Sequence, residues 1–179
     1  MSQKPSIMVA VCEQMVCIKV CGKADYTSTL DLRNRIDDLW RQGYPRFVFE
    51  LCDCIGMDST FLGTLSGLGL EAREGVARKG PSLELYNPTP RITEVLENLG
   101  VAHLFTITNG AGPSPCNYEP LLKSLDVTRA DVTRNCLEAH QTLMEVNPNN
   151  VPKFKDVTKF LAEDLKRQES GGNKDVSNN

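Results

Sequence analysis

The stretch from Arg46 to Lys79 constrains the fold more than any other part of this chain. Residues 46–51 form a short apolar run that includes Phe47, Val48 and Phe49, residue types favoured in β-strands. Residues 53–58 have loop-forming chemistry, including Gly56. Beyond them, residues recur at spacings of three and four, as on one face of a helix: Leu62, Leu65, Leu68, Gly69, Ala72 and Val76. The stretch therefore predicts a buried strand, a tight loop and a helix.

Ser59 lies at the predicted junction of the loop and the helix. Asp58, Ser59 and Thr60 are all residue types that cap helix N-termini, so the helix is expected to begin within one residue of Ser59. A phosphate on Ser59 would suit the fold, because helix N-termini favour anions. It would also add about −1.5 to −2 charges beside Asp53 and Asp58. The local chemistry leaves two interpretations open, a simple helix cap and a switch that expels a docked partner.

Three segments resemble the STAS domain of anti-sigma factor antagonists. Residues 54–63, CIGMDSTFLG, resemble the signature loop of that family. Residues 22–25, GKAD, resemble its Gly-x-x-Asp turn after the second strand, and residues 85–100 resemble its late strand and the helix that follows. The resemblance covers roughly residues 5–110. It implies an α/β fold in which helices pack on a small mixed β-sheet.

The resemblance also implies a site. In the family, an anti-sigma factor kinase phosphorylates the first hydroxyl residue of the signature loop, which in this chain is Ser59. Thr60 stays open as an alternative acceptor. Phe61 stands where many members have glycine, and is either a partner anchor or a core contact. Residues expected to shape the acceptor loop and the partner-binding surface are Asp25, Asp58, Thr60, Phe61, Leu62 and Gly63.

The implied function is partner switching in transcription regulation and signal transduction. The chain would bind an anti-sigma factor or a serine kinase while Ser59 is unmodified, release it when Ser59 is phosphorylated, and be reset by a phosphatase. The alternative is a structural STAS subunit of a lipid-transport ABC complex or of a signalling scaffold, in which Ser59 is not modified. We do not expect an enzyme, a metal or a cofactor, because the sequence has no phosphate-loop glycine pattern, no Ser-His-Asp set and no metal-ligand spacing.

Composition argues against several other classes of protein. A net charge of −3 provides no electrostatic basis for binding nucleic acid. No apolar run approaches the ~18 residues that a membrane span requires, and the N-terminus does not resemble a signal peptide, so we expect a cytoplasmic protein without membrane insertion. An odd number of cysteines fits reduced thiols: Cys12, Cys17, Cys21, Cys52, Cys54, Cys116 and Cys136. Cys52 and Cys54, two positions apart, are expected to be small buried thiols rather than a metal or redox pair.

Alternating strand and helix patterns fill the rest of the first 110 residues. Strands are predicted at 7–11, 15–21, 82–86 and 104–108, with Val16, Ile18 and Val20 facing the core. Helices are predicted over 28–42 and from Pro88 to Gly100. A break is expected at 79–81. Three glycines inside the helix after Ser59 are interpreted as points of close packing against the sheet rather than as a docking face: Gly63, Gly67 and Gly69.

Gly and Pro residues at 109–115 mark the clearest boundary in the chain. They divide it into a STAS domain (1–110), a linker (111–117), a C-terminal helical hairpin (118–168) and a disordered tail (169–179). Pro148 separates the two helices of the hairpin, and the second begins near Pro152. The first carries the stripe Val132, Cys136, Leu137, His140, Leu143 and Met144, in which His140 is expected to be a helix-face residue. The hairpin is expected to dock on the core, to form a homodimer, or to bind a partner.

Overall fold

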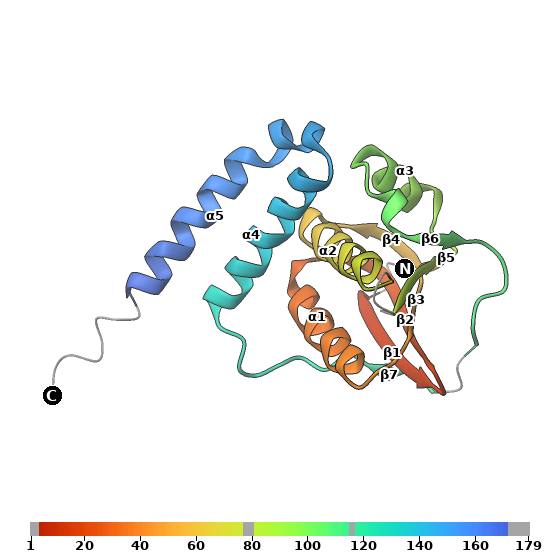
Figure 1. Ribbon diagram of the computed structural model, residues 1–179. Helices are drawn as coiled ribbons and strands as arrows, with labels where there is room; N and C mark the ends of the chain where they lie inside the picture. Colours follow the sequence, from red (N-terminus) through yellow and green to blue (C-terminus); the bar gives the residue numbers. More distant parts are fainter. Residues whose placement is uncertain (1–3, 77–80, 115–116, 172–179) are drawn as a thin grey trace, which may run out of the picture.

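A mixed β-sheet lies at the centre of the molecule (Figure 1). The computed structural model describes residues 4–76, 81–114 and 117–171. The strand order is β6-β5-β3-β2-β1-β7, and β4 pairs with the end of β2. The two pairings of β1 are antiparallel and the others are parallel. The strands are β1 (Ser6–Cys12), β2 (Met15–Ala24), β3 (Arg46–Glu50), β4 (Cys54–Met57), β5 (Ser82–Tyr86), β6 (Thr106–Thr108) and β7 (Glu119–Pro120).

Helices cover one face of this sheet, which confirms the expected α/β architecture. In Figure 1, α1 and α2 lie over the sheet, α4 lies beside α2, and α5 lies on the outer side of α4. The helices are α1 (Tyr26–Arg41), α2 (Ser59–Val76), α3 (Pro90–Asn98), α4 (Arg129–Val146) and α5 (Val151–Gly171), with short 3₁₀ turns at η1 (Ala102–Leu104) and η2 (Pro148–Asn150).

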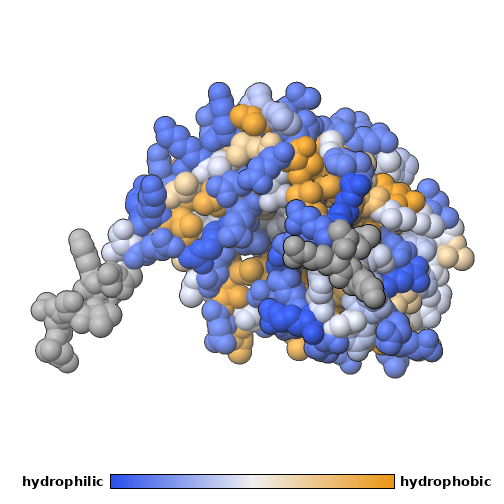
Figure 2. Space-filling view, in the orientation of Figure 1, coloured by the Kyte–Doolittle hydropathy of each residue, from blue (hydrophilic) through white to orange (hydrophobic). Residues whose placement is uncertain are grey.

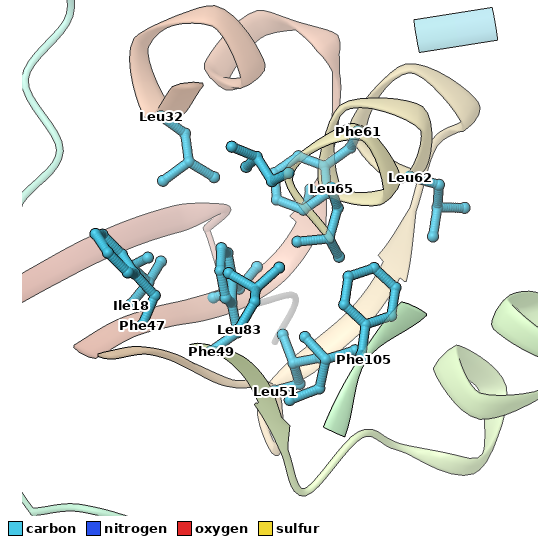
Figure 3. Packing of buried hydrophobic residues seen from close by; sticks show 14 of the residues in the cluster. Ile18, Leu32, Phe47, Phe49, Leu51, Phe61, Leu62, Leu65, Leu83 and Phe105 are labelled. Carbon is cyan, nitrogen blue, oxygen red and sulfur yellow. The ribbon is translucent and has the colours of Figure 1, made fainter. Parts of the chain in front are cut away.

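The main core lies between the sheet and the helices α1 and α2. Figure 3 shows Phe61 and Leu65 projecting from α2 toward the strand residues Phe47 and Phe49. The predicted inward face of β2 is confirmed, because Val16, Ile18 and Val20 are fully buried. Each such aliphatic or aromatic side chain contributes about 1.5–3 kcal/mol to folding through removal from water.

The segment before Ser59 is more regular than the sequence indicates. Residues 54–57, expected as loop, form β4, which pairs in parallel with residues 22–24 of β2. This pairing depends on Gly22, whose φ of 73° and register shift let β2 continue past the point where the sequence predicts its end. The helix expected from Ser28 begins at Tyr26, because Asp25 caps it.

The glycines of α2 approach other elements instead of the sheet, so their expected role is wrong. A Cβ on Gly63 would overlap the backbone carbonyl of Ala139 in α4, and one on Gly67 would reach Thr142 at 4.0 Å. A Cβ on Gly69 would meet Phe105, the residue that follows η1, at 2.8 Å. The turn η1 also shortens the last predicted strand, so that β6 begins at Thr106.

The segment after β6 crosses the sheet face opposite the helices. A Cβ on Gly112 would meet the Glu50 carboxylate at 2.8 Å and the Tyr86 ring at 3.2 Å. Burial beside Cys17 raises the pKa of Tyr118 to about 12. Residues 119–120 then form β7 along β1, so the expected linker starts against the sheet at Gly112 and is followed directly by a strand of that sheet.

The helical hairpin begins later than the sequence indicates. Residues 121–128 are not helical, and α4 begins at Arg129 behind a capping box between Thr128 and Asp131. Helix α5 continues to Gly171, into the range expected as disordered. The rest of that tail (172–179), the expected break at 79–80, and Cys116 lie outside the described residues.

Six cysteines fall within the described residues, and all are free thiols. Cys54 is buried, as expected, whereas Cys52 is exposed, so the expectation of a buried thiol is wrong there; Cys17 is also buried. Burial raises the pKa of Cys17 to about 11, so this thiol stays protonated at neutral pH. Among the described residues, no group of three or more His, Cys, Asp or Glu side chains is arranged to hold a metal ion.

Candidate functional site

Asp58 joins the N-termini of two helices. Its Oδ1 accepts a hydrogen bond from the backbone N–H of Phe61 (2.8 Å) and so caps α2. Its Oδ2 accepts from the backbone N–H of Tyr26 (2.8 Å), the first residue of α1. The N–H of Asp58 donates to the carbonyl of Ala24 at 3.0 Å. One carboxylate therefore satisfies a free donor of each helix and fixes the position of Ser59, the first residue of α2.

Asp25 supports the same corner from the side of α1. Its Oδ1 accepts hydrogen bonds from the backbone N–H of Thr27 (3.0 Å) and from the Thr27 hydroxyl (2.6 Å). Asp25 is therefore the N-cap of α1, and these contacts direct its carboxylate to its own helix. The two carboxylates expected at the site are brought together as caps of neighbouring helices.

Replacing Asp58 with alanine is expected to lower the free energy of unfolding by about 2–3 kcal/mol, since both helices lose a capping acceptor. Asp25→Ala is the matched control, because it removes one cap and should cost about 1 kcal/mol. Urea denaturation of the full chain followed by circular dichroism measures both values. Equal losses in the two variants would contradict the double role of Asp58.

Ser59 forms a hydrogen bond with a histidine from the C-terminal hairpin. Its Oγ lies 2.9 Å from Nε2 of His140, and Nδ1 of His140 lies 2.6 Å from the carbonyl oxygen of Cys136. Because a carbonyl only accepts, we assign the ring proton to Nδ1, so that Nε2 accepts from the Ser59 hydroxyl. The ring also packs edge-on against Phe154 of α5, with centroids 5.3 Å apart. These contacts hold the half-buried side chain of Ser59, at the start of α2, against α4.

Small residues on one face of α2 allow α4 to pack close to it. Ser59, Gly63 and Gly67 recur at spacings of four, so they share one face of α2. Gly63 meets the backbone of Ala139, which is 3% exposed. One turn away, burial raises the pKa of the Cys136 thiol, and a hydrogen bond from the Thr60 hydroxyl acts in the opposite direction. The first turns of α2 therefore face α4.

The residues expected on the partner surface divide into two groups. Asp58 and Ser59 lie at the helix start, partly exposed, and Asp25 lies beside them. Phe61 and Leu62 are 1% and 2% exposed and belong to the core, which favours a core contact over a partner anchor for Phe61. Thr60 and Gly63 are buried. The large apolar side chains that stay exposed nearby include Tyr26 (50%) and Ile55 (55%).

The sequence did not indicate His140 as a partner of Ser59. The two residues are 81 positions apart, and the stripe that contains His140 fits any apolar helix face. The 2.9 Å distance between the Ser59 Oγ and the His140 Nε2 is within the range found between a catalytic nucleophile and its general base. The histidine is buried and Ser59 is half-buried, however, and neither residue lines the hollows found along α1 beside residues 119–124 (about 420 Å³) and between α1 and the start of α4 (about 500 Å³).

Comparison with known proteins supports the fold expected from the sequence. A solved structure of the anti-sigma factor antagonist SpoIIAA in its unphosphorylated form matches with a TM-score of 0.50 and 21% identity, over 59% of this chain and 89% of that chain. An anti-sigma factor antagonist from Mycobacterium paratuberculosis matches with a TM-score of 0.48 and 15% identity, over 58% of this chain and 85% of that chain. No curated protein matches the chain.

No described helix is both long enough and apolar enough to cross a bilayer. The model of the STAS domain family matches residues 6–111 and stops before the hairpin. That range covers more than half of the 179 residues, and its strands and helices follow the order that the signature segments predict. The chain therefore belongs to the STAS domain family.

Proposed function

We propose that this chain is a protein-interaction module controlled by phosphorylation of Ser59, in the manner of an anti-sigma factor antagonist. With Ser59 unmodified it binds an anti-sigma factor or a serine kinase, and with Ser59 phosphorylated it releases that partner. A phosphatase restores the binding form. The module is regulatory rather than catalytic, and its partners place it in the cytoplasm.

The observation that carries this proposal is the position of Ser59 where two helices begin. It is the first residue of α2, and Asp58 ties that helix to the first residue of α1. Backbone N–H groups and the positive ends of both helix dipoles therefore lie near its hydroxyl. This arrangement favours a negatively charged phosphate attached to Ser59. Thr60 is the poorer acceptor, since it is 6% exposed.

The same position explains release of a partner. A phosphate would add about −1.5 to −2 charges next to Asp58 and close to Asp25. Like charges this close repel any acidic group of a partner and raise the cost of burying the loop in an interface. Ser59 is not a member of the apolar core beneath, so we expect the charge to alter binding while the sheet and its core keep their fold.

Phosphopeptide mass spectrometry of the full chain, purified from its native cells with its bound proteins, tests this function. We expect phosphate on Ser59, lost in Ser59→Ala and retained in Thr60→Ala, together with a kinase-like partner that prefers the unphosphorylated form. Absence of phosphate from Ser59 in every growth phase, with a transporter subunit bound, would contradict the proposal and identify a structural STAS subunit.

A further inference from the structure

The hairpin of α4 and α5 covers the surface on which the proposed function depends. In Figure 1, α4 runs beside α2 and meets its first turns. Figure 2 shows mainly hydrophilic residues on the exposed side of the hairpin. The family model ends at residue 111, so this cover is an addition to the STAS domain. The protein thus supplies its own occupant for the start of α2.

A phosphate on Ser59 does not fit beneath this cover. Phosphorylation would place a phosphorus atom and three further oxygens on Oγ, which now lies 2.9 Å from Nε2 of His140. His140 is 6% exposed and is held by the carbonyl of Cys136, so its ring cannot turn aside without losing that bond. Beside it, Gly63 and Ala139 already touch through their backbones. Room for a phosphate at this position therefore requires α4 to move away, and turning the partly exposed Oγ aside instead breaks the Ser59–His140 hydrogen bond that links α2 to α4.

The hairpin can leave without disturbing the sheet. Helix α5 has no buried residue and packs against α4. Residues 121–128 join α4 to the core without helix or strand, and Leu122 and Leu125 are 83% and 98% exposed there. Helix α4 packs extensively on α2 and buries Ala139, His140 and Leu143 there, and Asn150 after it donates to the carbonyl of Leu99 at 2.9 Å. Release exposes these groups and the face of α2 that they cover, whereas the strands make few contacts with α4.

We propose that docking of the α4–α5 hairpin and a phosphate on Ser59 exclude each other, so that the hairpin is an internal competitor for the partner-binding surface. The inference rests on the proposed function for the source of the phosphate. The coupling is reciprocal: a phosphate on Ser59 disfavours docking of the hairpin, and docking of the hairpin disfavours phosphorylation of Ser59 by the same free energy. A kinase or a partner therefore reaches Ser59 after the hairpin has been released.

Hydrogen–deuterium exchange of the full chain tests this coupling without a kinase. In Ser59→Asp, amide exchange in α4 is expected to rise about tenfold, while the strands β2 and β3 keep their protection. Ser59→Ala removes the hydroxyl without adding charge, and Gln141→Glu adds the same charge on the exposed face of α4. Both controls should leave exchange in α4 within about threefold of the wild type. Unchanged exchange in Ser59→Asp would overturn the inference.

A second measurement observes the coupling from the other side and adds no charge to Ser59. The variant Ser59→Cys is alkylated with iodoacetamide, and the modified peptide is identified by mass spectrometry. Ala139→Glu on α4 is expected to raise its labelling rate about tenfold by opening the hairpin, whereas Gln141→Glu should not. Equal rates in the three backgrounds would overturn the inference even if Ser59→Asp loosened the core.

The two proposals fail in different ways. If Ser59 carries no phosphate in native cells, the switch is wrong, yet exchange in Ser59→Asp still reports whether charge and docking exclude each other. If phosphate is present and α4 stays protected in Ser59→Asp, the switch stands and the hairpin is a permanent part of the fold.

Discussion

Phe61→Ala is expected to lower the free energy of unfolding by about 3–5 kcal/mol, the usual cost of deleting a large buried side chain. Phe61 is 1% exposed and lies between α2 and the strands, among Leu65, Phe47 and Phe49 (Figure 3). Alanine would leave a cavity there, because the surrounding side chains come from a rigid sheet and can only partly close it. The position where many STAS domains carry glycine is here part of the core.

Urea denaturation of the full chain measures this loss, with Ile55→Ala as the control. Ile55 lies on β4 close to the same site but is 55% exposed, so its truncation should change stability by about 0.5 kcal/mol or less. A loss below about 1 kcal/mol in Phe61→Ala, with a clear defect in partner binding, would instead identify Phe61 as a partner anchor.

Gly63→Ala is expected to destabilise the docked hairpin by about 1–3 kcal/mol, although alanine is the better helix former by about 1 kcal/mol. The added Cβ would overlap the carbonyl of Ala139, and backbone atoms on both helices cannot rotate out of the way as a side chain can. The helices must separate instead. Hydrogen exchange should rise in α4 while the strands stay protected.

Gly67→Ala is the matched control for this prediction. It lies one turn further along the same face of α2, where a Cβ would meet atoms of Arg33 and Thr142 at 3.9 and 4.0 Å, ordinary contact distances. This variant should therefore gain up to about 1 kcal/mol from helix propensity. If the two variants behave alike, the close approach at Gly63 does not limit docking of α4.

Local patterns in the sequence determined most of the STAS core. The alternation of Val16, Ile18 and Val20 predicted a buried strand face. The spacing of apolar residues after Asp58 predicted a helix, and the capping residues around Ser59 predicted its start to within one residue. Both are properties of short segments, because burial of one face imposes a period of two on a strand and of 3.6 on a helix. The signature residues then identified the fold, since they lie at turns and caps where few residue types fit.

Contacts between distant segments were decided by the tertiary structure alone. The pairing of β4 with β2 arises because Gly22 lets one strand bend and continue, which no periodicity records. The glycines of α2 were interpreted as points of packing against the sheet, whereas the element that approaches Gly63 is the helix whose His140 lies 81 residues from Ser59. A stripe of apolar residues predicts that one face of a helix is buried. Which element buries it depends on shape complementarity and hydrogen bonding. For this protein, that choice places the hairpin on Ser59.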